Sequence, residues 1–571
     1  MRDFLKTTSL FVGRYYRGFR RRLAKVPFVY QLYRRCSLCQ RLDTKLLALL
    51  ERLSMLLPQP ARDIAQEIQE LLAQKQYREA LYLADALRKQ EDCPNSTLLH
   101  WITQACVALK AWDLFDRTYY PAMEELAQVA IESDSRVKKE HCEGALEEAA
   151  LSMLQNARLE VAHRLLMLAD TVGSRPRYRL LAALMRFIQQ QEPETKKRAN
   201  VLRAQHEKEE INVIGSIVWG EKYLDAFMTY NVRSMLAEGN MPNLRTHGLL
   251  VHSIVTTTAG VDYIRAHPVY PALAKVAQLE FFTFPEGLLD LFKGEDGPDR
   301  WSYLLYGILD HINLFFARGL KANLFLIPVD AIVANPSFTN MRRYLTEGFD
   351  CCGGGNLVAE RDGFLAALKA AHGTDGALTI DTKALATLAL AHPHQYITSQ
   401  LIHDDNNNFG KHARELFWPV EGGIAVHSIY THPLVISERR LCGDYDMPYS
   451  WVDFLLAPRL FPDPKDFPKY KIIDNAAEAY INNFAPAGRQ YETTGRAFDP
   501  GDFIAVHGHS YPIHRHMLAT RQFIPCETPP LHNSHDITVD EARLREMLSE
   551  TFDKDGAAHL THPCHLSEVM Y

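Results

Sequence analysis

The stretch "INVIGSIVWG", residues 211–220, marks the point where the chain changes character. Its β-branched residues predict a strand, and the segment "EKYLDAFMTYNVRSMLA" that follows, residues 221–237, has the apolar spacing of a helix. A second run, "THGLLVHSIVTT", residues 246–257, repeats the strand pattern. Strand, helix and strand in this order are typical of a parallel sheet whose faces are covered by helices.

The same alternation continues to about residue 485. The further β-branched runs are "LEFFTF" (279–284), "ANLFLIPVDAIV" (322–333), "FDCCGGGNLVAE" (349–360), "AVHSIYTHPLVI" (425–436) and "YKIIDN" (470–475). Helical candidates such as "RWSYLLYGILDHINLFFARGL", residues 300–320, lie between them. We therefore expect residues 206–485 to form a Rossmann-like α/β domain with a mostly parallel sheet.

In residues 41–205 the apolar residues recur with the period of a helix in one segment after another. This pattern predicts a domain of helical hairpins. Tyr77 and Trp112 begin equivalent positions 35 residues apart, close to the 34-residue tetratricopeptide (TPR) period, although the full consensus is absent. The domain is thus expected to be TPR-like or a plain helical solenoid. Stacked hairpins of this kind present a groove to peptides or partner domains, so we expect a protein partner here.

The two ends of the chain have their own composition. Residues 1–35 contain ten Arg or Lys and one acid, a charge of +9, which leaves −15 for the rest of a chain whose net charge is −6. Aromatic and aliphatic residues interleave these cations, so residues 1–40 suit an amphipathic arm that docks on an anionic membrane surface; a solvated or self-packed arm and nucleic-acid binding are the alternatives. Residues 486–571 are rich in His and Pro and show no core pattern of their own.

The bulk composition bounds the class of protein. With 571 residues, 47% hydrophobic and 23% charged, the chain is long enough for two to four globular domains. No apolar run reaches the length of a membrane-spanning helix, and the apolar run at residues 7–12 is too short for a secretory signal. Ten scattered cysteines without a signal peptide predict reduced thiols in the cytoplasm.

Polar residues follow several of the predicted strands. Ser216 and Trp219 end the first run, Thr257 ends the second, Asp330 follows "NLFLIP", and Asp474 follows "KYKII". Ligands of parallel α/β sheets collect at the carboxyl ends of the strands, so these residues are the first candidates for a binding site.

Two other features admit simple structural readings. Gly353, Gly354 and Gly355 predict a turn with positive φ, because neither GxGxxG nor GxxxxGK[ST] is present. His427 and His432 are five residues apart, so a single strand sends their rings to opposite faces and only a bend could bring both to one metal ion. We expect "AVHSIYTHPLVI" to be one sheet element, with His432 the better candidate to face a ligand because Pro433 follows it.

A family resemblance rests on these segments. Residues 219–257, from "WGEKYLDAFMTY" to "VHSIVTT", resemble the opening of a bacterial glycosyltransferase-like domain of the nucleotide-diphospho-sugar (GT-A) type. In that family a first strand and helix lead to a "sLLapgNlP" turn and then to a strand ending in a Thr pair. Here the turn is "SMLAEGNMPNL", with Gly239, Asn240 and Pro242 in place.

Further segments extend the resemblance over residues 209–516. "GLKANLFLIPVDAIVANPSF", residues 319–338, is similar to the family's "PDhvfsdGsf" element. "HSIYTHPLVI", residues 427–436, resembles its His-containing strand, and "YKIIDNAAEA", residues 470–479, its acidic "DSDE" strand.

The resemblance implies a glycosyltransferase that moves a sugar from a nucleotide-sugar donor to a glycan or protein acceptor. It places Ser216, Trp219 and Thr257 near the nucleotide and Asp330 at the diphosphate. Such enzymes commonly bind Mg²⁺ or Mn²⁺ through an Asp-x-Asp, so Asp330 and the literal pair Asp444 and Asp446 in "GDYDMP" are the candidate metal ligands. The candidates for catalysis, on the acceptor side, are Asp474 and His432.

Departures from the family pattern keep a second reading open. Pro328, Val329 and Asp330 stand where the family shows a Pro-Asp pair, and Asp474, Asn475 and Ala476 stand where it shows Asp-Ser-Asp-Glu. Both changes weaken an acidic cluster. The alternative is therefore a catalytically degenerate, glycosyltransferase-like scaffold that recruits partners through its helical domain and basic arm. Either reading keeps the cytoplasmic location that the scattered cysteines predict, with docking at the inner face of a membrane if the arm binds lipid.

Overall fold

A computed structural model describes residues 61–546 apart from short gaps. The gaps are at 75, 89–94, 133–135, 157, 174–175, 293–299, 405, 407, 411–412, 430–431, 433, 446–451, 488–492, 502, 504–510, 528–539 and 545. The basic arm expected at residues 1–40, and Asp446, lie outside the described residues. The chain divides into two compact units, Met1–Val129 and Ala130–Tyr571. Each unit is described by itself.

The first unit is helical where it is described. Its helices are α4 (Ala61–Ala73), α5 (Tyr77–Arg88), α6 (Asn95–Leu109), α7 (Trp112–Leu114), the π-helix η1 (Phe115–Tyr119) and α8 (Tyr120–Glu132), whose last residues belong to the second unit. Neighbouring helices bury small and aliphatic side chains against one another, among them Ile68, Ala84 and Ile102. The helical prediction is confirmed for these segments. Across the described residues, no helix combines the length and the apolar character that crossing a bilayer requires.

The second unit begins with helices that the sequence assigned to a separate domain. These are α9 (Arg136–Gln155), α10 (Leu159–Gly173) and α11 (Pro176–Gln205). Helix α11 packs against α17 (Arg300–Leu320), where a Cβ on Gly319 would lie 2.7 Å from that of Ala199. Arg198 of α11 also donates to the Phe281 carbonyl oxygen at 3.0 Å. The units therefore divide at 129/130, whereas the sequence placed a boundary at 205/206, because α11 is packed onto the α/β part.

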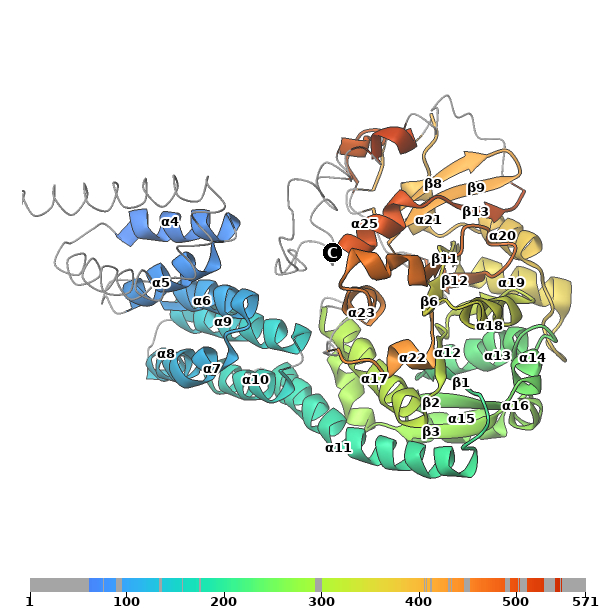
Figure 1. Ribbon diagram of the computed structural model, residues 1–571, viewed down its shortest axis with the longest axis horizontal. Helices are drawn as coiled ribbons and strands as arrows, with labels where there is room; N and C mark the ends of the chain where they lie inside the picture. The colour runs from blue at the N-terminus through green and yellow to red at the C-terminus, as the bar shows by residue number, and fades with distance from the viewer. Residues whose placement is uncertain are drawn as a thin grey trace, which may run out of the picture. The chain divides into compact units, whose positions relative to one another are not determined.

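A seven-stranded, mostly parallel sheet forms the centre of the second unit (Figure 1). Its strands, in spatial order, are β11 (Tyr470–Ile472), β6 (Cys351–Gly353), β10 (Leu434–Ile436), β4 (Asn323–Leu326), β1 (Ile211–Ile217), β2 (Leu249–Thr256) and β3 (Gln278–Thr283). Only β10 runs antiparallel to its neighbours. The predicted α/β class with a mostly parallel sheet is thus confirmed.

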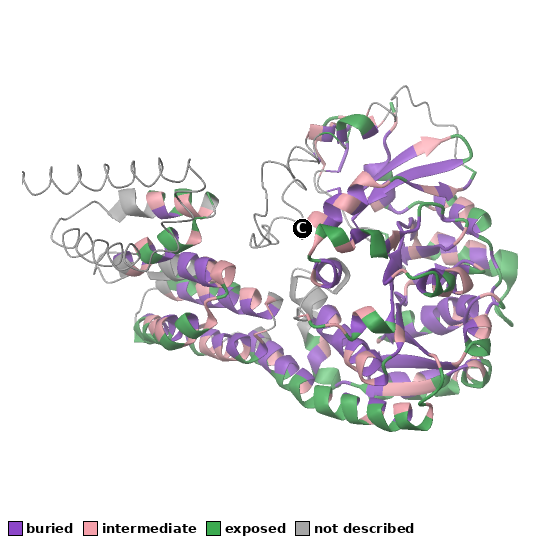
Figure 2. Cartoon of the chain, in the orientation of Figure 1, coloured by how far each residue is buried: buried purple, intermediate pink, exposed green. Residues whose placement is uncertain are grey.

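Helices cover both faces of this sheet, so β1 and β2 are buried along their whole length (Figure 2). On one face, Gly215 and Ser253 contact Asn313 of α17. On the other, Ile214 and Ile254 join the core formed by helices on that side. Those helices are α12 (Glu221–Ala226), the π-helix η2 (Phe227–Asn231), α13 (Val232–Met235), α14 (Met241–Thr246), α15 (Thr258–Ala266), α16 (Tyr270–Val276) and α18 (Ser337–Thr346).

Two three-stranded sheets complete the unit. One is ordered β5 (Ala331–Val333), β12 (Ile481–Ala485) and β7 (Val358–Glu360), and the other β13 (Gln522–Pro525), β9 (Gly423–Ser428) and β8 (Glu415–Val420). Three predicted runs are therefore each divided between two sheets. β4 and β5 share one run, β6 and β7 the next, and β9 and β10 the third, so the prediction of "AVHSIYTHPLVI" as one sheet element was wrong. Pro328 lies between the two strands of the first run, and Gly354 and Gly355 lie between the two strands of the second.

The remaining elements surround these sheets. They are the 3₁₀ helices η3 (Glu286–Phe292) and η4 (Pro464–Lys469), with α19 (Arg361–His372), α20 (Thr382–Ala391), α21 (Gln395–Gln400), α22 (Glu438–Leu441), α23 (Val452–Leu460) and α25 (Pro512–Ala519). Strand β13 and helix α25 belong to the His/Pro-rich extension expected at 486–571. β13 pairs with β9 and α25 packs on the same strand, so this extension completes a sheet of the unit that precedes it.

Candidate functional site

The order of the main sheet reverses between β1 and β4, because β2 and β3 lie on one side of β1 while the later strands lie on the other. Open α/β sheets bind ligands at the carboxyl edge beside such a reversal. Trp219 follows β1 and Asp330 follows β4 at this edge. Since β10 runs antiparallel to β4, His432, which precedes β10, lies at the same edge. Three predicted site residues thus flank three adjacent strands at one edge of the sheet.

The chain around Asp330 is held in place from two sides. The buried side chain of Asn231, in η2, donates through Nδ2 to the carbonyl oxygens of Pro328 at 3.1 Å and Ala331 at 2.6 Å. The amide of Phe484, in β12, donates to the carbonyl oxygen of Asp330 at 2.8 Å. The backbone of the half-buried Asp330 is therefore fixed.

The "EGNMP" turn that carries the family resemblance supports this same segment. The amide of Gly239 donates to Asn335 Oδ1 at 2.8 Å, and the amide of Phe338 donates to Asn240 Oδ1 at 3.1 Å. A Cβ on Gly239 would lie only 2.3 Å from that of Pro336, so glycine is required by close approach. The turn is thus a scaffold for the loop after β5.

Trp219 lies in an aromatic group beside the carboxyl edge. Its ring centroid is 5.8 Å from that of Phe284, which follows β3, and 6.2 Å from that of Tyr306 in α17. Gly220, with φ of 76°, lets the chain turn from Trp219 into α12. Partly exposed aromatic rings at this position are suited to stack against a nucleobase.

Two predicted nucleotide contacts, Ser216 and Thr257, use their hydroxyls within the protein. Ser216 Oγ lies 3.0 Å from Nε2 of His252, and both residues are buried. Burial lowers the pKa of His252 to about 3, so its imidazole is neutral. Thr257 Oγ1 accepts from the amide of Gly260 at 3.1 Å and caps α15. Both residues reach the expected edge, but their hydroxyls already have internal partners.

The sequence interpretation missed Glu415, at the start of β8. Its carboxylate accepts from Ser428 Oγ at 2.7 Å and from the hydroxyl of Tyr396 at 3.0 Å, and the side chain is buried. Burial raises the pKa of Glu415 to about 7, while those two hydrogen bonds and the charge of His432 lower it. A titratable group perturbed in this way marks a candidate functional site. The sequence signal that could have indicated Glu415 is a single acidic residue at the start of the apolar run "ELFWPV".

The sheet that contains Glu415 reaches the carboxyl edge of the main sheet. The amide of Gly355, just beyond β6, donates to Oε1 of the buried Gln522 in β13. A Cβ on Gly355 would lie 3.5 Å from that of Ser428. The predicted positive φ is wrong for Gly353, Gly354 and Gly355. Gly353 is the last residue of β6, and Gly354 and Gly355 allow the close approach of neighbouring segments.

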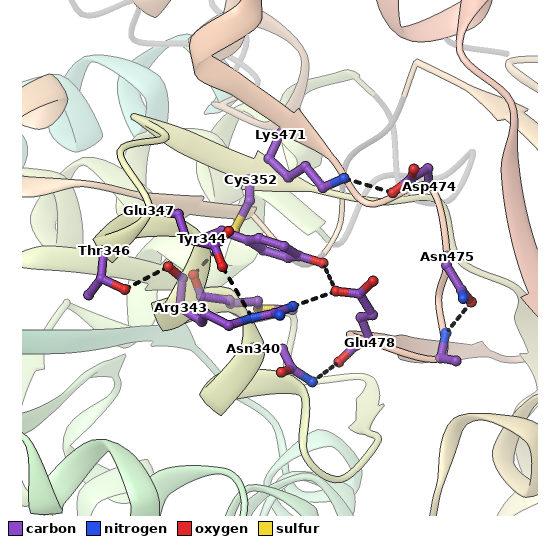
Figure 3. Close-up of polar contacts among 12 residues, drawn as sticks. Asn340, Arg343, Tyr344, Thr346, Glu347, Cys352, Lys471, Asp474, Asn475 and Glu478 are labelled. Atoms are coloured by element: carbon purple, nitrogen blue, oxygen red, sulfur yellow. Dashed lines mark hydrogen bonds and ion pairs between the residues drawn. The ribbon is translucent and has the colours of Figure 1, made fainter.

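Asp474 follows β11, at the far end of the same edge (Figure 3). Its carboxylate accepts from Lys471 Nζ at 2.7 Å, and this hydrogen bond holds the pKa of Asp474 below its usual value. Glu478, one turn later, accepts from Arg343 and from the hydroxyl of Tyr344, both on α18. Figure 3 shows these two donors converging on the Glu478 carboxylate, which therefore anchors α18.

Asp444 lies away from this edge. Strand β10 ends at the amino edge of the main sheet, where the amide of Glu438 donates to Asn323 Oδ1 at 3.0 Å. Gly443, beside Asp444, accepts from Arg318 at 3.0 Å. The structure thus does not bring Asp444 to Asp330. Within the described residues, no group of three or more His, Cys, Asp or Glu side chains could hold a metal ion.

His427 has a structural environment. Its Nδ1 lies 2.6 Å from the carbonyl oxygen of Leu518 and its Nε2 lies 3.0 Å from Glu541 Oε1, and the ring is fully buried. It therefore ties β9 to the C-terminal segment, while His432 lies at the carboxyl edge.

Comparison with known protein families, with curated sequences and with solved structures finds no match for this chain.

Proposed function

We propose that this chain is a glycosyltransferase-like protein that transfers a sugar from a nucleotide-sugar donor to a glycan or protein acceptor, within a domain of GT-A type. The observation that carries the proposal is that Trp219, Asp330 and His432 flank three adjacent strands at the carboxyl edge, beside the reversal of the sheet order. The resemblance of the segments around those residues supports the same reading.

Trp219 and Asp330 would bind the donor. The aromatic group of Trp219 offers a surface for the base, and Asp330 lies one strand away, on the diphosphate side. Mg²⁺ in nucleotide sites is commonly bound by one or two carboxylates together with water and substrate phosphates, so a single Asp330 fits such an ion. The ion would neutralise charge on the departing diphosphate.

His432 is a better candidate than Asp474 for the catalytic residue on the acceptor side of the proposed site. β10 is the direct neighbour of β4, whereas β11 is three strands from β4. At about 4.8 Å per strand, Asp474 is on the order of 14 Å across the sheet from the Asp330 strand, and His432 about 5 Å. Asp474 is also paired with Lys471. We therefore place His432 next to the hydroxyl that attacks the sugar.

Donor binding is the first test. A thermal-shift screen of nucleoside-diphosphate sugars, each with and without Mn²⁺, should reveal a stabilising donor, because a ligand at 100 times its Kd adds about 2.7 kcal/mol to the state that binds it. Asp330→Ala should abolish the shift at an unchanged unfolding midpoint. Asp444→Ala removes an exposed carboxylate at the opposite edge and should leave the shift intact. Equal loss in both variants would contradict the assigned edge.

The engaged hydroxyls of Ser216 and Thr257 support a second candidate, the degenerate scaffold. In that case the domain keeps the fold while groups that would face a nucleotide serve the protein interior. The same screen separates the two candidates. Absence of a shift with every donor would reject the enzyme and leave the scaffold, whose partners would bind equally well to the Asp330→Ala chain.

A further inference from the structure

Within the first unit, the helical run formed by α7, η1 and α8 has two different faces. The inward face is apolar and buried, and consists of residues at helical spacing: Phe115, Tyr119, Met123 and Ala127. The opposite face is exposed. Up to residue 129 this outer face consists of Asp113, Leu114, Arg117, Pro121, Glu124, Glu125, Gln128 and Val129. At 1.5 Å per residue, the outer face is roughly 27 Å long.

The outer face combines negative charge with exposed apolar side chains. It carries three acids and one arginine, and neither Glu124 nor Glu125 forms an ion pair within the described part of the chain. Leu114 is 41% exposed and Val129 is 51% exposed. On α5, by contrast, the exposed charges are of mixed sign, since Arg78 lies beside Glu79. The outer face therefore suits a partner that offers both cations and apolar groups.

The basic arm of the same chain offers this combination. Its first 35 residues contain ten Arg or Lys and one acid, interleaved with apolar residues such as Phe4, Leu10 and Phe19. Residues 36–60 join it to α4, and a connection of this length spans up to about 80 Å when extended, so the arm can reach the outer face. A tethered segment has an effective concentration on the order of millimolar, so even a weak contact is well populated.

We propose that the basic arm docks on the outer face of its own chain. Its cations pair with Asp113, Glu124 and Glu125, and its apolar side chains cover Leu114 and Val129. This inference does not depend on the proposed glycosyl transfer. The docked arm has its charge neutralised and its apolar groups covered, so docking withholds it from an anionic membrane surface, which needs the same cations.

Cross-linking of the full chain tests the contact directly. A carbodiimide joins a lysine amine to a carboxylate that lies against it, and the arm contains two lysines, Lys6 and Lys25. Mass spectrometry should find one or both joined to Glu124 or Glu125, with a yield independent of protein concentration. The yield should fall several-fold between about 0.05 and 0.5 M NaCl, because exposed charges are screened. Absence of these cross-links would overturn the proposal, and so would a yield that rises with concentration, the mark of contact between two copies.

Charge-neutral variants test the role of the acids. Glu124→Gln with Glu125→Gln removes two charges from the outer face, and Glu70→Gln with Glu79→Gln removes two exposed charges from α4 and α5 as the matched control. Tryptic cleavage within the arm should be about two- to fivefold faster in the first variant than in the control, because exposed ion pairs are individually weak. Equal cleavage rates would contradict docking.

Membrane binding is the competing use of the arm. Because docking withholds the arm, the Glu124→Gln, Glu125→Gln chain should bind phosphatidylserine vesicles about two- to fivefold more tightly than the control variant. If both variants bind vesicles as tightly as the wild-type chain does, the arm is already free for the membrane and the proposal is overturned.

Discussion

At the scale of single residues, Glu415 makes the stability of the fold depend on pH. Its pKa is about 7 in the folded chain against an ordinary 4.5, so between these values the folded state holds a proton that the unfolded state has released. Its contribution to the free energy of unfolding is therefore present below pH 4.5 and falls as pH rises to 7, by at most about 1.4 kcal/mol per pH unit.

Glu415→Gln should remove this dependence. Urea unfolding of the second unit at pH 5 and pH 8 gives the difference in free energy between variant and wild type at each pH. The variant should gain relative to wild type at pH 8, by about 2 to 3 kcal/mol more than at pH 5. The opposing contribution of His252, whose pKa is lowered, is common to both chains and cancels. A difference that is constant with pH would show that the carboxyl is ionised throughout.

At the scale of elements, the turn at Gly239 determines how the loop after β5 is held. Gly239→Ala would place its Cβ 2.3 Å from Pro336 Cβ and 2.6 Å from Asn335 Oδ1, so the loop has to move. Overpacking of this kind costs about 1 to 3 kcal/mol, and we expect that loss in thermal or urea unfolding, together with weaker donor binding. Gly144→Ala, in open space on α9, is the control and should be neutral or stabilising by up to about 1 kcal/mol. A neutral Gly239→Ala would refute the scaffold role of the turn.

The elements also show how much of the fold can be predicted from the sequence. β1 and β2 lie within their predicted runs, because strands buried on both faces appear as continuous β-branched stretches. The edge strand β3 is shifted by one residue from its predicted run. The runs containing Pro328, the three glycines and His432 each divide between two sheets. A local sequence pattern indicates that a segment is extended, but it does not indicate which strands the segment pairs with. Glu415 was missed for the same reason, because its hydrogen-bond partners Ser428 in β9 and Tyr396 in α21 come near it only when the strands and the helix are assembled.

At the scale of the whole molecule, the C-terminal segment decides whether the second unit is complete. The sequence treats residues 486–571 as an extension, whereas the structure uses β13 to pair with β9 and Gln522 to bind the loop after β6. The buried His427 takes both of its partners, Leu518 and Glu541, from the same segment. A chain that ends at residue 510 loses all of these contacts. We expect it to lose the cooperative thermal transition of the second unit and to become susceptible to limited proteolysis.

A point variant separates the loss of strand β13 from the loss of the His427 contacts. His427→Leu in the full chain keeps β13 but leaves the Leu518 carbonyl and the Glu541 carboxyl without their imidazole partner, although Arg521 still lies 3.6 Å from Glu541. Each buried polar group left without a partner costs about 1 to 3 kcal/mol, so the variant should unfold at lower urea concentration with its cooperative transition retained. If the chain ending at 510 unfolds like the full chain, β13 is an accessory strand. In that case the boundary near residue 485 is a true domain limit, and Glu415 is held in place without β13.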